Sequence, residues 1–496
     1  MLTFGEALED PPSADIAAHG LITAGAHDHP EPFLVRHPGK GIGWGPLGDN
    51  RTADAFSPPA PGWLPDDRAL RAVTRLGALL RAISRPRMPK PPILPPGSRS
   101  VLLYSPANLN NVDGSTVWVD SVVRTLLVDP GVHVTLPLRA PQRRDVITAT
   151  LRRLERVRLV DVHPRLAGRA LGLSTTQALD LIERLDRDRP FDAILLRSFQ
   201  LSLRATERPS LRGRIWACYI LEPERDADDS EYRGAMGRIA EASRFVVVQS
   251  EGMRQLLESV VPAARGRTIL LPPGIPDETS RRADPDRPVQ RLVYTGKFHP
   301  FYPVERMIEF LTELRQGEVP GLEFHVAGDK FMDVEDDPGY APRLRRLLET
   351  TPGVVWHGSM PREDVVNLVA EGGVALNLWD YRHGPQMNEL VVSTKLLDYA
   401  SVGVPVVLTR TPTQVELYGE AYPLFVDQVD EALPLLRRVL TEPDLYRLTA
   451  QRSYEASRAF TYPRVHALIA PYLGAGESGP SFGGPAAGTS ERTSER

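Results

Sequence analysis

LWDYRHGPQMNELVVSTKLLDYASVGVPVVLT, residues 378–409, is the stretch of the chain that decides its fold. An apolar strand ends near Trp379, a polar loop follows, and Ser393 or Thr394 is the expected cap of an apolar helix. Gly403 marks the end of that helix, and a proline leads into the next apolar strand. A buried strand, a crossover helix and a second buried strand in this order are typical of a parallel sheet.

The same alternation of strand and helix occurs in two runs along the chain. The strands expected in the first run are SVLLY, HVTL, RLVDV, AILL, RIWACYIL, RFVVVQS and TILLP, and those in the second are RLVYTG, EFHVAG, VVWHG, VALNLW, PVVLT and YPLFV. Strands that are apolar along their whole length are buried on both faces. The pattern predicts an α/β protein with two Rossmann-like, doubly wound parallel-sheet domains that face each other across a cleft.

The 47 prolines and 39 glycines of this 496-residue chain gather in three places, which mark the domain boundaries. Clusters such as HPGKGIGWGPLG indicate an extended N-terminal segment, LPPGIPD a linker, and GAGESGPSFGGPAAG a disordered tail. The expected parts are a Pro/Gly-rich segment with one amphipathic helix at 1–97, a first Rossmann-like domain at 98–276, a linker at 277–289, a second domain at 290–456, a C-terminal helix at 457–474 and the tail at 475–496.

Composition excludes several classes of protein. A net charge of −4, from 59 basic and 63 acidic residues, removes the usual electrostatic case for a nucleic-acid partner. The sequence has no apolar run of about twenty residues and therefore no expected transmembrane segment. The N-terminus does not read as a secretory signal, and one cysteine cannot form an intrachain disulfide. A cytoplasmic protein is therefore expected.

The amphipathic helix expected between Asp66 and Arg87 has two interpretations. Its leucines and arginines fit a weak peripheral contact with an anionic membrane surface. They also fit a helix that packs its apolar face on the first domain, and the shortness of the run and its lack of an aromatic anchor favour packing.

Lys395 and Asp398 are the first candidate binding residues. They share one face near the N-terminus of the helix that starts at Ser393 or Thr394. Free N–H groups and the positive end of the helix dipole at that position suit a phosphate, and a carboxylate one turn on can accept hydrogen bonds from a ribose diol. An ordinary capped helix with a surface Lys–Asp pair explains the same residues equally well.

Two further strands end in glycine, which favours a binding site over an ordinary capped helix. Gly296 is followed by Lys297, and Gly328-Asp329-Lys330 repeats this pattern at the end of the next strand. A glycine at the carboxyl end of a strand lets a ligand approach the backbone, and a lysine there can neutralise a pyrophosphate. Together these loops predict a nucleotide-diphosphate pocket in the second domain. The histidines lack the spacing of metal ligands, and no metal site is expected.

The second half of the chain resembles the donor domain of retaining GT-B glycosyltransferases, in the group often called family 4 or glycosyl transferases group 1. The matching stretches are RLVYTGKF, EFHVAGDK, VVWHGSMPREDVVNLVAEGGVALNLW and STKLLDYASVGVPVVLTRT, and FVVVQSEGMRQLL with TILLPPGIPD is similar to the segment before the linker. The resemblance spans roughly residues 98–473. It implies an acceptor-side first domain, a donor-binding second domain and a last helix that crosses back to the first.

The resemblance also implies roles for residues of the donor site. Lys297 and Lys395 would lie beside the diphosphate, and Asp398 would bind the ribose. Glu389, one residue from the position where the family has its first glutamate, would lie near the sugar. Tyr302 stands where a second lysine is usual.

In the first domain, Gly114 and Ser115 replace the paired glycines that the family usually has before its first helix. Arg197 occupies the region where the family often has a histidine. These residues would line the cleft opposite the donor.

These expectations combine into one reaction. Sugar would pass from a nucleotide-diphosphate sugar to an unknown acceptor, with retention, by a metal-independent front-face displacement in which Lys297, Lys395 and Glu389 are the catalytic candidates. No cofactor is expected besides the nucleotide sugar as co-substrate. Two alternatives stay open, a nucleotide-sugar epimerase of the same architecture and a catalytically degraded scaffold subunit.

Overall fold

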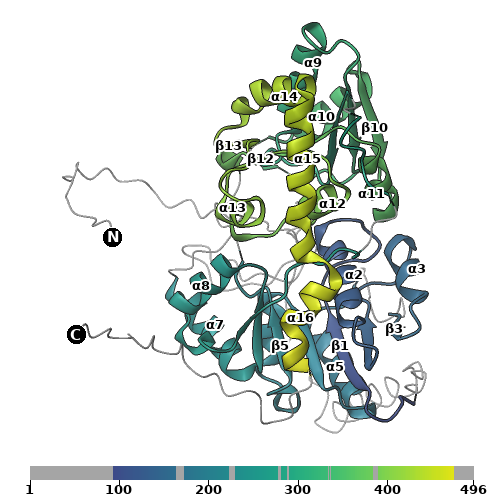
Figure 1. The fold of residues 1–496 in the computed structure, drawn as a ribbon. Coiled ribbons are helices and arrows are strands. Elements are labelled where there is room, and N and C mark those ends of the chain that lie inside the picture. The colour runs from purple at the N-terminus through teal and green to yellow at the C-terminus, as the bar shows by residue number, and fades with distance from the viewer. Residues whose placement is uncertain are drawn as a thin grey trace, which may run out of the picture. The chain divides into compact units, whose positions relative to one another are not determined.

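The computed structural model describes residues 93–162, 172–222, 229–277, 281–287, 290–332, 334–335, 337–383 and 389–473. The expected N-terminal helix and C-terminal tail lie outside these residues. In the described ranges the chain forms two parallel sheets with helices packed around each (Figure 1). The predicted α/β class with two Rossmann-like domains is confirmed.

The first lobe is built on a parallel sheet with the strand order β3-β2-β1-β4-β5-β6-β7. Its strands are β1 (Arg99–Tyr104), β2 (Val132–Pro137), β3 (Val157–Val160), β4 (Ala193–Arg197), β5 (Ile215–Cys218), β6 (Phe245–Val248) and β7 (Thr268–Leu270). Its helices are α2 (Gly114–Leu126), α3 (Val146–Arg152), α5 (Thr175–Asp188), α6 (Phe199–Ala205), α7 (Ser230–Ala242) and α8 (Glu251–Val260), with short 3₁₀ turns at Pro209–Leu211 and Pro262–Ala264.

The second lobe has a parallel sheet with the strand order β10-β9-β8-β11-β12-β13. Its strands are β8 (Arg291–Thr295), β9 (Glu323–Ala327), β10 (Val354–Gly358), β11 (Val374–Asn377), β12 (Val406–Thr409) and β13 (Phe425–Val426). Its helices are α9 (Val304–Gln316), α10 (Tyr340–Thr350), α11 (Arg362–Ala370), α12 (Thr394–Val402), α13 (Pro412–Tyr418), α14 (Ala432–Thr441) and α15 (Pro443–Ser457), with 3₁₀ turns at Tyr381–His383, Val429–Glu431 and Arg458–Phe460.

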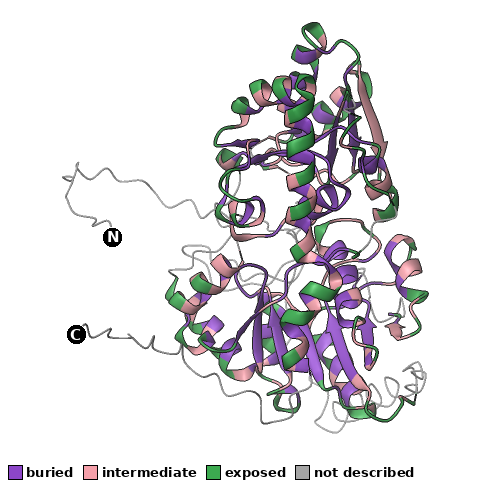
Figure 2. Ribbon diagram, in the orientation of Figure 1, coloured by how far each residue is buried: buried purple, intermediate pink, exposed green. Residues whose placement is uncertain are grey.

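The strands are buried because they are apolar along both faces, as their sequences predict. In the central strand β1, Leu102 and Leu103 are fully buried. Figure 2 shows that buried residues concentrate on the strands and on the inward faces of the helices. The edge strand β10 is half-buried throughout, because it has a neighbouring strand on one side only. Each sheet therefore has its own apolar core.

The last helix, α16 (Tyr462–Leu473), joins the core of the first lobe although it follows the second lobe in sequence. Val465, Ile469 and Leu473 are buried among first-lobe residues. Just before this helix, Ile275 donates a backbone hydrogen bond to Phe460 and accepts one from the amide that opens α16, each 2.8 Å long. The chain thus passes between the lobes at two adjacent places. None of the described helices is long and apolar enough to cross a membrane.

The strand orders determine where a ligand can bind. In the first sheet the chain runs outward from β1 to β3 and then returns to place β4 on the other side of β1. In the second sheet it runs from β8 to β10 and returns to place β11 beside β8. The crevice of such a sheet lies at the carboxyl ends of the two strands where the order reverses. These are β1 with β4 and β8 with β11.

Candidate active site

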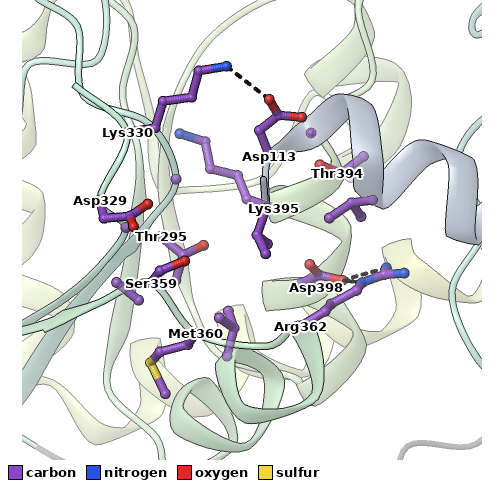
Figure 3. Close-up of a pocket in the computed structure, with 17 residues that line it drawn as sticks. Asp113, Thr295, Asp329, Lys330, Ser359, Met360, Arg362, Thr394, Lys395 and Asp398 are labelled. Atoms are coloured by element: carbon purple, nitrogen blue, oxygen red, sulfur yellow. Dashed lines mark hydrogen bonds and ion pairs between the residues drawn. The ribbon is translucent and has the colours of Figure 1, made fainter. Parts of the chain in front are cut away.

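A pocket lies at the carboxyl ends of the second-lobe strands and at the start of the first-lobe helix α2 (Figure 3). Residues 112–114 and Val117 form its first-lobe wall. The second lobe contributes Thr295, Gly296, Ala327, Gly328, Asp329, Lys330, Ser359, Met360, Arg362, Val365, Thr394, Lys395 and Asp398.

The N-termini of two helices, one from each lobe, meet at this pocket. A Cβ atom on Gly114, the first residue of α2, would lie 3.5 Å from the Oγ1 atom of Thr394, the first residue of α12. Asp113 caps α2, because its carboxylate accepts from the amides of Ser115 at 2.9 Å and Thr116 at 3.1 Å. Ser393 occupies the cap position of α12, but its side chain makes no capping bond. The amides at the start of α12 are therefore not capped by a side chain.

Two glycines bring bare backbone to the pocket. Gly296 and Gly328 have φ angles of 139° and 151°, which side chains rarely allow. A Cβ atom on Gly328 would lie 2.0 Å from the carbonyl oxygen of Gly296, so the two backbones pass too closely for any other residue. The indole of Trp356 donates to the Gly328 carbonyl at 2.8 Å and fixes this loop.

Lys395 enters the pocket as a cation without an acidic partner. Its Nζ atom lies 4.4 Å from the ring centre of Tyr294 and 4.3 Å from that of Tyr302. No carboxylate of the described residues lies within ion-pair distance of it. Burial, and then the charge of Lys297, lower the pKa of Lys395 to about 7. Two aromatic faces thus flank a buried cation, and an anionic ligand would stabilise its charge.

Binding of a nucleotide sugar is expected to weaken as the pH rises above 7. Below pH 7 the free protein holds Lys395 protonated, whereas above it ligand binding must first return a proton to the amine. An intact nucleotide-diphosphate sugar is the suitable probe, because a free nucleoside diphosphate carries a terminal phosphate that titrates near pH 6. Calorimetry between pH 6 and 9 should show affinity falling toward about tenfold per pH unit, with proton uptake on binding. The same pH dependence in a Lys395→Met variant would contradict the assignment.

Lys330 and Asp113 form an ion pair between the lobes. The Nζ atom of Lys330 lies 2.9 Å from Oδ2 of Asp113, as the dashed line in Figure 3 shows. Burial alone would raise the pKa of Asp113, but Lys330 and the two amides of α2 outweigh it and hold that pKa below its usual value. Asp113 therefore stays ionised and joins the loop after β9 to the start of α2.

Asp398 belongs to a second chain of charges, which also spans the lobes. Its Oδ1 atom accepts from Nε of Arg362 at 3.1 Å and from Nη2 at 2.7 Å. Nη1 of Arg362 lies 3.7 Å from Asp120 on α2, and Arg124 donates to both oxygens of Asp120 at 3.0 and 2.9 Å. Burial raises the pKa of Asp398, and Arg362 opposes that rise. Negative and positive side chains alternate along this series, so their charges neutralise one another.

Solved structures share this two-lobe architecture. HepE from Anabaena, solved in complex with UDP and glucose, is 13% identical, with a TM-score of 0.54 over 76% of this chain and 99% of that one. Sucrose-phosphate synthase from Thermosynechococcus elongatus is 14% identical, with a TM-score of 0.56 over 75% and 97%. WaaG, a glycosyltransferase of lipopolysaccharide biosynthesis, is 14% identical, with a TM-score of 0.52 over 76% and 100%. Identity at this level shows the GT-B fold alone.

A similarity in sequence to a known family comes mainly from the second lobe. Residues 304–468 match a family model described as glycosyl transferase-like. This chain has the GT-B fold, and within it residues 304–468 are similar to glycosyl transferase-like domains. The prediction of a glycosyltransferase is thereby confirmed. No curated protein is similar enough in sequence to be matched.

The structure of this GT-B protein gathers only part of the expected donor site. The residues that line the pocket are Gly114, Gly296, Gly328, Thr394, Lys395 and Asp398. Lys297 does not line it, but its Nζ atom lies 5.6 Å from the same Tyr302 ring that faces Lys395. Ser393 borders a second cavity instead, between Gln249, Gln414 and Phe460. Tyr302, which stands where the family usually has a second lysine, thus presents its ring to both Lys297 and Lys395.

Glu389, Ser115 and Arg197 also lie outside the lining of this pocket. Burial raises the pKa of the Glu389 carboxyl. The next residue, Leu390, accepts a 2.7 Å hydrogen bond from the hydroxyl of Ser250, which ties this loop to the first lobe. The backbone of Ser115 is engaged by the Asp113 cap, and Arg197 ends strand β4.

Three further residues of the site had no role in the sequence-based expectations: Asp113, Asp120 and Arg362. Asp113 carries a detectable signal, because an aspartate directly before a helix is a preferred cap. Lys330 was expected in the loop after Gly328, but its ion pair with Asp113 was not. Arg362 and Asp120 carry no signal, since their partners come from other helices.

Proposed function

We propose that this GT-B protein transfers a glycosyl group from a nucleotide-diphosphate sugar to an acceptor, with retention at the anomeric carbon and without a bound metal ion. One observation carries the proposal. The uncapped N-terminus of α12, the start of α2 and Lys395 meet where two glycines bring bare backbone to the pocket, and no described carboxylate pairs with that lysine. Free amides, helix dipoles and a cation at one place suit a diphosphate.

The same groups would act on the leaving group. When the glycosidic bond to the diphosphate breaks, negative charge grows on the phosphate oxygens. Lys395 and the amides at Thr394 would stabilise this charge more strongly in the transition state than in the bound substrate, which is what lowers a barrier. Lys297, held beside the same tyrosine ring, would add positive potential. In this proposal these groups do the work that a metal ion does elsewhere, so no cofactor is needed.

The sugar and ribose would be held at the two ends of the pocket. Asp398 has one carboxylate oxygen committed to Arg362, so its other oxygen would accept from the ribose. Glu389 would bind sugar hydroxyls, as the resemblance implies. Gly114 and Ser115, at the start of α2, would approach the donor from the first lobe.

A front-face displacement fits the carboxylates of the pocket. Of the acidic residues that line it, Asp113 is paired with Lys330, and Asp398 with Arg362. Asp329 lies 3.9 Å from Arg144. Each carboxylate of the described lining thus has a cation beside it, whereas a double displacement would need one aimed at the anomeric carbon. Attack by the acceptor on the face that the diphosphate leaves preserves the configuration.

A uridine nucleotide is the first donor to test, because HepE and an E. coli trehalose-6-phosphate protein were solved with UDP or a UDP-sugar. The one cysteine, Cys218, is a buried free thiol, which agrees with the cytoplasmic location that we propose.

A nucleotide-sugar panel tests the function. The full chain would be offered UDP-, GDP- and TDP-sugars, with thermal unfolding and nucleotide release recorded with and without acceptor extracts. We expect one nucleotide class to raise the unfolding temperature and acceptor to stimulate release, with the product's anomeric configuration by NMR showing retention. If no nucleotide shifts the transition, the donor site is wrong. Donor conversion without acceptor would indicate an epimerase, and binding without turnover a scaffold.

A further inference from the structure

Arg197 is a second cation without an acidic partner, and it lies in the first lobe. Its guanidinium carbon is 5.3 Å from the ring centre of Trp118 and 4.9 Å from that of Tyr219. These two rings meet edge to face with their centres 5.1 Å apart and form a corner. Within the described residues no carboxylate lies in ion-pair distance of Arg197, and its buried Nε atom has no hydrogen-bond partner.

The position of Arg197 in the fold is that of a ligand-binding residue. It ends strand β4, which lies beside β1 where the strand order of the first sheet reverses. Trp118, which forms one side of the corner, directly follows Val117 on α2, and Val117 lines the donor pocket. The guanidinium is therefore placed at the crevice of the first lobe, next to the wall that faces the donor.

A second arginine reinforces the positive charge of this edge. Arg139 follows β2, on the other side of β1, and is half-buried. Its Nη1 atom donates to the carbonyl of Pro106 at 2.8 Å, and it has no carboxylate partner among the described residues. Two cations without counter-ions among the described residues thus flank the carboxyl end of β1.

The geometry points to an anionic substrate, and this inference rests on the proposed function. We propose that Arg197 binds a phosphate or carboxylate group carried by the acceptor or by the donor's sugar. The two nearly perpendicular rings flank the guanidinium, and its planar N–H edge makes no hydrogen bond to the described residues. That planar edge matches the paired oxygens of a carboxylate or phosphate. A half-buried guanidinium without a counter-ion is costly, and an anionic substrate would provide the missing charge.

The test compares Arg197→Gln with Arg204→Gln. Arg204 lies in the same lobe on α6, is 60% exposed and pairs with Glu207, so the same change there leaves the crevice intact. Inorganic phosphate would be titrated calorimetrically into each full-length protein, with and without saturating UDP. We expect Arg197→Gln to weaken the UDP-independent phosphate site by about tenfold or more, the size expected of a charge-assisted hydrogen bond. Arg204→Gln should bind like the parent.

Two pairs of probes then identify which substrate carries the anion. Glucose 6-phosphate is compared with glucose at saturating UDP, and UDP-glucuronic acid with UDP-glucose in competition with UDP. A preference for the charged member that disappears in Arg197→Gln and persists in Arg204→Gln supports the inference and names the source. Equal binding of charged and neutral members by the parent, or an unchanged preference in Arg197→Gln, overturns it.

Two controls separate this inference from the proposed function and from misfolding. Arg197→Gln should retain the unfolding temperature and the UDP affinity of the parent. Failure of the parent to bind UDP would refute the donor site, while the phosphate titration without UDP would still decide the role of Arg197. Arg197→Lys keeps the charge but loses the planar edge, and it should recover only part of the affinity.

Discussion

Replacement of Lys395 by methionine is expected to lower the turnover of the nucleotide sugar by at least about 100-fold. The ammonium group lies against two tyrosine rings at the start of α12, without a described carboxylate to take up its charge. Its charge is thus available to the leaving diphosphate, and methionine fills similar space without that charge. Steady-state kinetics with the donor found by the nucleotide panel would measure the loss in kcat/KM.

A matched substitution at Lys297 tests the specificity of this effect. Lys297 shares the Tyr302 ring but does not line the pocket, so Lys297→Met should cost less than Lys395→Met. Equal losses of kcat/KM in the two variants would show that Lys395 stabilises the leaving group no more than Lys297 does.

The stability of these variants should also differ in its dependence on pH. Because folding lowers the pKa of Lys395, the free energy of unfolding of the parent should rise with pH between about 7 and the ordinary lysine range. Lys395→Met should lack that rise.

Replacement of Arg362 by methionine is expected to lower the free energy of unfolding by about 3–5 kcal/mol. Arg362 is 16% exposed and donates two hydrogen bonds to Asp398, which is itself buried, while its third nitrogen faces Asp120. Its removal leaves the Asp398 carboxylate buried without a cation and also removes a link between α11 and α2. Urea unfolding at pH 7 would measure the change.

Arg410→Met is the control for this prediction. Arg410 makes ion pairs with Glu420 and Asp427, which are 81% and 72% exposed, so its loss should cost no more than about 1 kcal/mol. Asp398→Asn added to Arg362→Met should restore part of the stability, because it removes the uncompensated charge. No recovery in the double variant would mean that packing, not charge, explains the loss.

The effect of Arg362→Met should also grow with pH. The raised pKa of Asp398 means that the folded protein holds its proton more tightly than the unfolded chain. Stability contributed by that group is present at low pH and is lost as the pH rises through the folded-state pKa. Without Arg362 that pKa rises further, so the loss should be larger at pH 8 than at pH 5. Equal losses at both values would contradict a charge-based cause.

Local patterns were sufficient for the elements around the site. The sequence placed a helix between Ser393 or Thr394 and Gly403, and α12 spans Thr394–Val402 with Gly403 in the left-handed conformation at φ 73°. It also placed Gly296 and Gly328 at strand ends, where both have positive φ. Such features depend on neighbouring residues and on the period of apolar side chains, which a sequence shows directly.

The sequence did not show which charged side chains pair with one another. Lys395 and Asp398, neighbours on one helix face, turn to different groups, the tyrosine rings and Arg362. Asp113 and Lys330 are 217 positions apart and still form an ion pair. Ser393 has the right residue type for a capping bond that the helix does not make.

The sequence by itself therefore determined the two doubly wound sheets and the strand-end loops where a ligand can bind, because burial on both faces imposes continuous apolar strands. Only the tertiary structure decided which charges in those loops are paired and which, like Lys395 and Arg197, have no carboxylate partner among the described residues. The physical reason is that an ion pair depends on a few ångströms between side chains of different helices. Strand order and lobe packing set that distance, and no spacing along the chain records it.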